Sequence, residues 1–241
     1  MFRGSVSDNI LTVTECTGVY RVGRGKGIQG NRNSCYLDAT LFSMFSFCGA
    51  FDSILMRKYE PHQKLAIDVQ KILRDDIVNC LRKDLYCPSG NVMQLRETMH
   101  HLDDKLTTAE MDPAEFLQIL FKEVLQVPEF IKLSSNESDF FHQVLVQTNE
   151  NDRNSVPSIQ LLFEQSLIMQ ELRLTEIPSP ALILQMPRSG NKYKMYDGIF
   201  PNLTIDITDL MENSKCTRLS KNSSWPFSVL RSTYDVHVVV F

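Results

Sequence analysis

The chain has 241 residues, of which 43% are hydrophobic and 9% aromatic, and this composition supports one large domain or two small ones with a sizeable core. Its 25 basic and 29 acidic residues give a net charge of −4 at pH 7, so no basic field favours nucleic acid or an anionic membrane as a partner. The first ten residues lack the apolar run of a secretory signal, and no window reaches the roughly 18 apolar residues of a membrane span. We therefore expect a soluble globular protein of the cytoplasm or nucleus.

The six cysteines lie far apart and form no C-x-x-C pair, so they predict neither a zinc site nor a dense disulfide framework. In a reducing compartment most of them would be small buried hydrophobic residues. We expect no metal and no cofactor. The cysteines are Cys16, Cys35, Cys48, Cys80, Cys87 and Cys216.

The first half of the chain has helical periodicity. Residues 1 to 26 form a lead-in that ends in the glycine-rich, basic string RVGRGKG (21–27), which is typical of a mobile, exposed loop. From residue 33 apolar residues recur at three- and four-residue spacing, which predicts a helix with Cys35 at its start. A second helix is predicted over residues 61 to 86, ended by CPSG (87–90), and a third begins at Asp112 and Pro113, with the aspartate as N-cap.

After Pro128 the pattern changes to short β-type runs separated by polar turns. The predicted strands cover residues 140–146, 181–186, 203–207 and 236–241. Helices therefore come first and strands second. This order indicates an α+β fold in which a helical lobe faces a sheet lobe, with a cleft between them.

Cys35 is the residue that points to chemistry. A cysteine at a helix N-terminus meets unsatisfied backbone N–H groups and the positive end of the helix dipole, and both favour the thiolate. The same N–H groups can bind a developing oxyanion, and Asn33 or Gln29 could add a side-chain donor. Taken alone, however, a cysteine before an apolar helix is most often a structural residue.

The neighbouring residues give a more specific indication. GIQGNRNSCYLDATLF (27–42) resembles the segment around the catalytic cysteine of the ubiquitin-specific proteases, a family of papain-like cysteine deubiquitinases. MDPAEFLQILF (111–121) resembles the family's Asp-x-x-Glu-Phe-Leu helix, and ALILQMPRSG (181–190) resembles its Leu-x-x-Gln-x-x-Arg-Phe strand. IFPNLTIDITDL (199–210) resembles the strand segment that follows. Four motifs in the family's order make chance similarity a poor explanation.

The resemblance implies a papain-like α+β fold in which a thumb of helices faces an antiparallel palm sheet, with the C-terminal tail of ubiquitin in the cleft. Residues 27 to 241 would form this catalytic domain, without its last strands. The implied activity is thiol-dependent removal of ubiquitin from conjugates or chains, with Cys35 as the nucleophile. Ubiquitin or polyubiquitin is the implied partner, and signalling adaptor proteins are further candidates. The family member that the Cys35 segment resembles most implies linear and extended lysine-linked chains as substrates, and a role in damping inflammatory NF-κB signalling.

A thiol protease of this type also needs a histidine base. FSVLRSTYDVHVVVF (227–241) resembles the family's strand pair that carries the catalytic histidine, which makes His237 the candidate; an ordinary edge-strand histidine is the alternative, and both readings stay open. Asp235 lies two residues away on the same strand face, a poor geometry for orienting the ring. The other histidines are expected to be surface or core residues: His62, His100, His101 and His142.

The chain also departs from the family pattern. The family's third catalytic residue lies on a strand well past the histidine, whereas this sequence stops four residues after His237, so we expect impaired catalysis and an incomplete sheet. Gly30 stands where most of the family has its oxyanion asparagine, and Ser189 replaces the aromatic residue after Arg188. Only Cys216 remains between residues 211 and 226, where the most similar relative has a zinc-binding insertion, so no metal site is expected there.

Three hypotheses follow. The first is an active cysteine deubiquitinase in which Cys35 attacks and His237 transfers the proton. The second is a ubiquitin-binding pseudoenzyme or truncated isoform that keeps the cleft without turnover. The third, in which Cys35 is an inert or redox-sensitive thiol of an unrelated α+β domain, is disfavoured by the ordered motifs.

Overall fold

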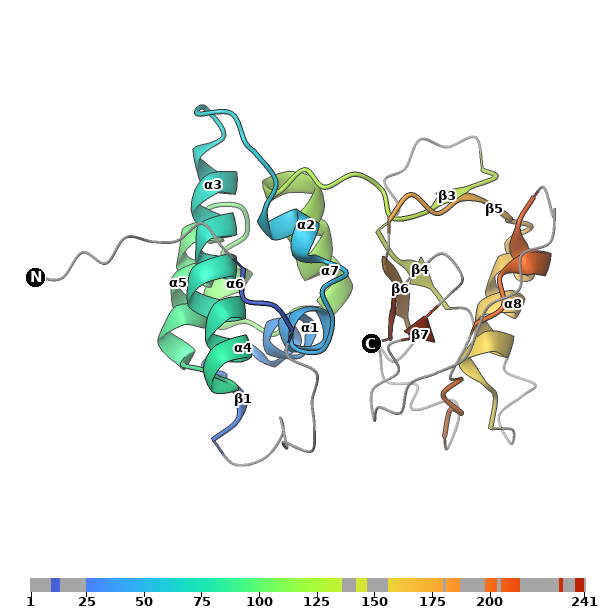
Figure 1. The fold of residues 1–241 in the computed structure, drawn as a ribbon, viewed down its shortest axis with the longest axis horizontal. Coiled ribbons are helices and arrows are strands. Elements are labelled where there is room, and N and C mark those ends of the chain that lie inside the picture. The colour runs from blue at the N-terminus through green and yellow to red at the C-terminus, as the bar shows by residue number, and fades with distance from the viewer. Residues whose placement is uncertain are drawn as a thin grey trace, which may run out of the picture. The chain divides into compact units, whose positions relative to one another are not determined.

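A computed structural model describes residues 10–13, 25–135, 142–146, 156–179, 181–186, 198–202, 205–212, 230–231 and 237–240, the last two strands by their backbone only (Figure 1). The chain divides into two compact units, residues 1 to 111 and residues 112 to 241. No helix in these described ranges is long and apolar enough to cross a membrane.

The first unit is mainly helical, as the periodicity predicts. Its helices are α1 (Cys35–Phe45), α2 (Asp52–Leu55), α3 (Lys64–Lys71), the π-helical η1 (Ile72–Val78), α4 (Asn79–Asp84), α5 (Ser89–Met99) and α6 (Lys105–Thr108). The prediction of a helix with Cys35 at its start is confirmed by α1. The second predicted helix is confirmed as the continuous run of α3, η1 and α4, which ends at Leu85 in the left-handed conformation.

Helix α5 was not predicted. The CPSG string does end the preceding helix, but the chain forms only the two-residue strand β2 (Tyr86–Cys87), parallel to β1 (Gly27–Ile28), before α5 begins at Ser89. The buried residues Val92, Leu95 and Met99 recur at three- and four-residue spacing along α5, so a helical signal was present in the sequence. Packing of α5 against α3 and η1 buries this stripe.

The second unit begins with α7 (Pro113–Gln118), which continues as the π-helical η2 (Ile119–Val124). Asp112 caps α7 as predicted, because its side chain accepts a hydrogen bond of 2.7 Å from the backbone N–H of Ala114. The predicted order of helices first and strands second is broken by α8 (Ile159–Met169), an eleven-residue helix capped by the Ser158 side chain. Its apolar run suits a helix that is buried along one side.

The strands of this unit are β3 (Lys132–Leu133), β4 (Val144–Leu145), β5 (Leu174–Glu176), β6 (Ala181–Gln185), β7 (Leu230–Arg231) and β8 (His237–Val240). The strand predicted over residues 181–186 is confirmed by β6, and β4 and β8 lie within two other predicted strands. For residues 203–207 the prediction is wrong where it is described: residues 205–207 form no strand and lead into the 3₁₀ helix η4 (Thr208–Leu210).

The antiparallel palm sheet is also corrected. Four strands lie in the order β4-β6-β8-β7, and β6 is parallel to both β4 and β8, while only the β7–β8 pair is antiparallel. The connection from β4 to β6 contains α8, and parallel neighbours require such a long crossover. Periodicity alone could not reveal this, because it identifies strands and not their directions.

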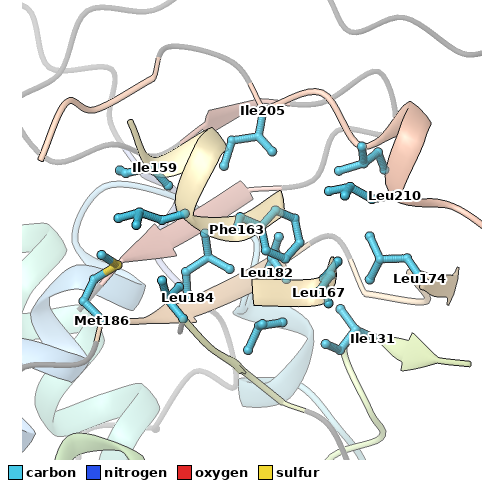
Figure 2. Close-up of a cluster of buried hydrophobic side chains, with 14 residues drawn as sticks. Ile131, Ile159, Phe163, Leu167, Leu174, Leu182, Leu184, Met186, Ile205 and Leu210 are labelled. Carbon is cyan, nitrogen blue, oxygen red and sulfur yellow. The ribbon is translucent and has the colours of Figure 1, made fainter. Parts of the chain in front are cut away.

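The core of the second unit lies between α8 and the sheet. Phe163 of α8 and Leu182 and Leu184 of β6 are at most 2% exposed and belong to one cluster of fourteen side chains (Figure 2). Ile205 and Leu210, from the segment around η4, belong to the same cluster. Burying side chains of this size contributes roughly 1.5–3 kcal/mol each, which explains why an apolar sequence after Pro128 folds as a helix on a sheet.

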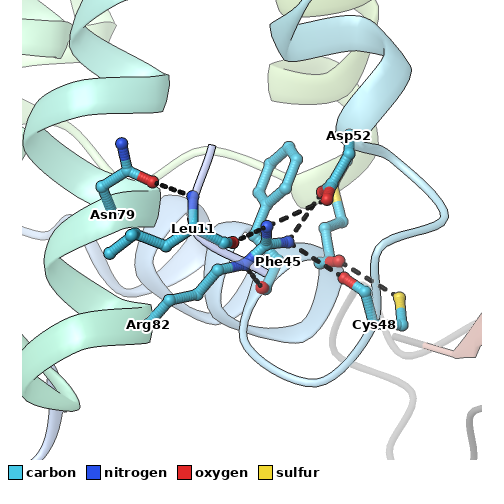
Figure 3. Close-up of polar contacts among 7 residues, drawn as sticks. Leu11, Phe45, Cys48, Asp52, Asn79 and Arg82 are labelled. Atoms are coloured by element: carbon cyan, nitrogen blue, oxygen red, sulfur yellow. Dashed lines mark hydrogen bonds and ion pairs between the residues drawn. The ribbon is translucent and has the colours of Figure 1, made fainter. Parts of the chain in front are cut away.

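Part of the predicted lead-in is hydrogen-bonded to helix α4 of the same unit. The backbone N–H of Leu11 donates to Asn79 Oδ1 at 2.9 Å, and the Leu11 carbonyl accepts from Arg82 at 2.8 Å (Figure 3). Both partners lie on α4. The mobile, exposed loop was predicted for residues 21–27, so these contacts at the exposed Leu11 do not test it, and it stays a prediction.

Candidate functional site

Cys35 is the first residue of α1, and its side chain is exposed. Its N-cap residue, Ser34, makes no side-chain hydrogen bond to the helix N-terminus, whereas Asp112 and Ser158 cap α7 and α8. In the described part of the chain the Cys35 amide has no hydrogen-bond acceptor. An accessible thiol therefore lies beside an unused backbone donor, as the sequence predicts for a nucleophile.

The other cysteines of the described residues have a different environment. Cys48 and Cys87 are buried, and burial raises the pKa of both thiols, that of Cys87 to about 12. Burial and two neighbouring carboxylates also raise the pKa of the half-buried Cys80. These three thiols are protonated at neutral pH, which makes them poor nucleophiles. Cys16 and Cys216 lie outside the described residues.

The segment that leads to Cys35 is attached to the first unit by its backbone. The N–H of Gly27 donates to the Leu85 carbonyl at 2.8 Å, and the N–H of Gln29 donates to the Cys87 carbonyl at 2.9 Å. Arg32 and Asn33, directly before Ser34, both have positive φ angles of 49° and 61°. Arginine rarely adopts this conformation, so the backbone before the thiol is strained.

The Ser34 side chain links this segment to α1 by hydrogen bonds. Its buried hydroxyl accepts a hydrogen bond from the Asn31 N–H at 2.9 Å and donates to Asp38 Oδ2 at 2.6 Å. Burial raises the pKa of the Asp38 carboxyl, although the Ser34 hydrogen bond and the Arg96 charge oppose this shift. A Cβ atom on Gly30 would lie 2.2 Å from Asp38 Oδ2 and 2.9 Å from Ser34 Oγ. A side chain at residue 30 would therefore displace the Asp38 carboxylate and the Ser34 hydroxyl, or the segment itself.

The two predicted side-chain donors lie on the Cys35 segment but bond to its backbone surroundings. Asn33 Nδ2 donates to the Thr108 carbonyl at 3.0 Å, and Gln29 Nε2 donates to the Lys26 carbonyl at 3.0 Å. Each amide group keeps a second N–H. Their role at an oxyanion stays a prediction.

Arg96 is the residue that the sequence analysis missed. It lies on α5, is 0% exposed, and donates from its two terminal nitrogens to the carbonyls of Asn31 at 2.8 Å and Arg32 at 2.9 Å. Its Nε also donates to the Leu106 carbonyl. The available signal was an arginine inside the apolar stripe of α5, next to Leu95. A buried charge at such a position needs specific partners, but the sequence could not name them.

The candidate base, His237, is described by its backbone only. His237 opens β8, where its backbone pairs with Ala181 of β6 and Arg231 of β7, and nothing of its side chain is described. It therefore lies inside the sheet, between two strands, and the edge-strand alternative is wrong for the described register. Its catalytic role stays a prediction. Asp235, Arg188 and Ser189 lie outside the described residues.

The other histidines fulfil the expectation of surface or core residues. His62, His100 and His101 are exposed. His142 is buried, its ring packs against Phe121 and Phe130, and its Nε2 lies 2.9 Å from the Val127 carbonyl. Burial lowers the pKa of His142, so the neutral ring with a proton on Nε2 is favoured.

His142 also lines a pocket of about 420 Å³ within the second unit. Four glutamines line this pocket, namely Gln118 of α7, Gln143 before β4, Gln170 after α8 and Gln185 of β6. Gln185 also donates to the N-cap carboxylate Asp112 at 3.2 Å. Among the described residues, no three histidine, cysteine, aspartate or glutamate side chains are grouped to hold a metal ion, here or elsewhere.

Comparison with known proteins identifies the chain's relatives. It is 40% identical over 200 residues to the ubiquitin carboxyl-terminal hydrolase CYLD of Homo sapiens, and equally to those of Mus musculus and Bos taurus. The chain is a homologue of these ubiquitin carboxyl-terminal hydrolases. The match covers 80% of the chain and 21% of each relative, so the chain spans about a fifth of the length of the curated CYLD proteins. No protein-family model matches the chain.

The homology confirms the resemblance that the Cys35 segment indicated. It also supports a papain-like α+β fold, with which the helices and small sheets of the two units agree. The name of the CYLD relatives states hydrolysis at the ubiquitin carboxyl terminus.

Proposed function

We propose that the chain is a cysteine-type deubiquitinase whose attacking group is the Cys35 thiol. The observation that carries this proposal is the exposed cysteine at the uncapped start of α1, in a chain 40% identical to CYLD hydrolases over 200 residues. The other described cysteines are at least partly buried, with raised pKa values, and so do not compete for this role.

In the proposed reaction the Cys35 sulfur attacks the carbonyl carbon at the C-terminal glycine of ubiquitin. The carbon–nitrogen bond breaks, the leaving amine takes a proton from His237, and ubiquitin remains on Cys35 as a thioester. Water then cleaves the thioester with His237 as base, which releases the ubiquitin carboxylate and restores the thiol. Backbone N–H groups near Cys35, with Asn33 or Gln29 as additional donors, stabilise the oxyanion of each step.

The first experiment is labelling of the purified chain with ubiquitin that carries a C-terminal propargylamide. We expect one ubiquitin adduct on Cys35, none in Cys35→Ala, and an unchanged yield in Cys48→Ala, whose thiol is buried. Cleavage of diubiquitin then tests turnover, and His237→Ala should abolish cleavage while ubiquitin binding persists. Absence of any adduct from folded protein would refute an active thiol.

A folded chain that binds ubiquitin without forming the adduct would instead be a ubiquitin-binding pseudoenzyme. Linear and extended lysine-linked chains are the substrates we propose to compare first, together with a role in NF-κB signalling through adaptor proteins. These finer assignments rest on the resemblance of the Cys35 segment alone. The cytoplasmic location expected from the sequence stays a prediction.

A further inference from the structure

Two buried arginines donate hydrogen bonds to backbone carbonyls at opposite ends of α1. Arg96 binds the segment before Cys35, and Arg82 binds the last turn of the helix and the residues after it. Arg96 donates to the carbonyls of Asn31 and Arg32, which lie four and three residues before Cys35. Three main-chain acceptors surround its guanidinium, the third being the Leu106 carbonyl. The planar fork of arginine suits such a set of fixed acceptors, which a lysine ammonium cannot match in geometry.

The direction of these carbonyls fixes the direction of the amides that follow. The described residues contain no cis peptide bond, and in a trans peptide the N–H points opposite to the preceding carbonyl. Because Arg96 holds the Asn31 and Arg32 carbonyls toward the buried side, the N–H groups of Arg32 and Asn33 point to the opposite, exposed side. Within the described part of the chain, neither of these two amides donates a hydrogen bond.

The N–H groups of Arg32 and Asn33 are backbone donors in a segment where Gly30 provides no side-chain donor. A Cβ at this position would lie 2.2 Å from Asp38 Oδ2. The positive φ angles of Arg32 and Asn33 raise the free energy of this backbone conformation, so it needs stabilising contacts from other parts of the first unit. Arg96 supplies such contacts from α5.

We infer that Arg96 is a positioning residue, which holds the Arg32 and Asn33 amides outward as donors to the oxyanion formed when Cys35 attacks. The inference deepens the proposed function and rests on it. Arg96 itself is fully buried and acts through the two peptide groups, without touching the substrate.

Arg82 provides a matched control for Arg96. It is 6% exposed, also lies in the first unit, and donates to the carbonyls of Phe45 at 3.1 Å and Cys48 at 3.2 Å, at the far end of α1 (Figure 3). It also forms a 2.7 Å ion pair with Asp52. Replacing either arginine by methionine leaves main-chain carbonyls without donors, but only Arg96→Met affects those before Cys35.

The test compares two ubiquitin derivatives on the folded fraction of each variant, as determined by circular dichroism. Ubiquitin C-terminal aldehyde forms a tetrahedral adduct whose oxygen needs donors, whereas ubiquitin propargylamide forms a vinyl thioether without an oxyanion. We expect Arg96→Met to weaken aldehyde binding about a hundredfold, the loss typical of one oxyanion donor, and to slow propargylamide labelling by less than about tenfold. Arg82→Met should leave both unchanged.

Arg96→Lys separates geometry from charge and decides the test if Arg96→Met does not fold. We expect it to weaken aldehyde binding as well, because the charge remains but the fork is lost. Aldehyde affinity equal to that of the wild type in Arg96→Lys, or equal losses in Arg96→Met and Arg82→Met, would overturn the inference.

A wild-type chain that reacts with neither ubiquitin derivative would refute the proposed function and not the role of Arg96. Alkylation of Cys35 by iodoacetamide at one pH, followed by mass spectrometry, then decides. We expect it to be slower in Arg96→Met than in Arg82→Met, because only Arg96 holds the peptide groups that directly precede this thiol. Equal rates in the two variants would overturn the inference.

Discussion

Gly30 offers the sharpest test of how closely the Cys35 segment is packed. In Gly30→Ala the new Cβ would lie 2.2 Å from Asp38 Oδ2 and 2.9 Å from Ser34 Oγ, and both distances are shorter than real Cβ contacts. Rotation of the Asp38 side chain away from the new Cβ would break the hydrogen bond of 2.6 Å that its Oδ2 accepts from the Ser34 hydroxyl. The substitution must therefore displace the segment or break this hydrogen bond.

The expected loss of stability follows from these contacts. Overpacking of this kind costs about 1–3 kcal/mol, and the reduced freedom of the unfolded chain returns about 0.4–1 kcal/mol, so the midpoints give a net loss of about 1.3 kcal/mol. For a unit of about one hundred residues this lowers the melting temperature by roughly 5–10 °C. The rate of ubiquitin propargylamide labelling should fall too, since the displaced segment carries Cys35.

The assay is thermal and urea denaturation followed by circular dichroism, with Gly90→Ala as the matched control. Gly90 lies near the start of α5, and a Cβ there meets nothing within 4 Å. Since alanine is the better helix former, Gly90→Ala should be stabilising by about 0.5–1 kcal/mol. The two glycine substitutions are thus expected to have opposite signs.

A double-mutant cycle identifies the clashing group. In an Asp38→Ala background the shortest contact of the new Cβ is removed, so Gly30→Ala should cost at least about 1 kcal/mol less than in the wild type. A Gly30→Ala variant as stable as the wild type, or a cycle without coupling, would refute the packing described here.

Three further predictions concern other polar groups. Burial lowers the pKa of His142, so the stability that its neutral ring contributes is complete above the usual histidine pKa of about 6.5 and is lost as pH falls toward the folded-state pKa. In urea denaturation, His142→Gln should therefore lose less stability between pH 7 and pH 5 than the wild type. Equal losses in the two proteins would contradict this prediction. Burial raises the pKa of Asp38, so the wild type loses stability as pH rises through the folded-state pKa. Asp38→Asn should therefore gain stability relative to the wild type as pH rises from 4 to 7. A relative gain of this variant as pH falls would contradict the prediction. Arg82→Met should lower the free energy of unfolding by about 3 kcal/mol in the same assay, because two buried carbonyls and Asp52 lose their donor. Lys83 is exposed on the same helix, so Lys83→Met should change the free energy of unfolding by less than about 0.5 kcal/mol.

The candidate nucleophile was predictable because its signal is local. The apolar spacing that starts after Cys35 defines α1, and neighbouring residues carry the family resemblance that the comparison with CYLD confirms. Asp112 was likewise predictable as an N-cap, since capping depends on residues within one turn. Strand β6 followed from its apolar run.

Other features depend on partners far away in the sequence, which no local pattern encodes. Parallel pairing of β6 with β4 and β8 depends on crossovers, and α8 is a helix because the sheet buries its apolar side.

The sequence by itself determined that Cys35 begins a helix, and it determined which proteins are related to this chain. Both follow from local patterns, because helical periodicity and the motifs each depend on residues that are close together in the sequence. Only the tertiary structure decided what surrounds the thiol. Arg96 binds the Asn31 carbonyl across 65 positions, and Gly30 is required by an Asp38 carboxylate that turns back from α1. A buried guanidinium needs acceptors and a crowded backbone needs space, and both requirements are met only when separate elements pack together.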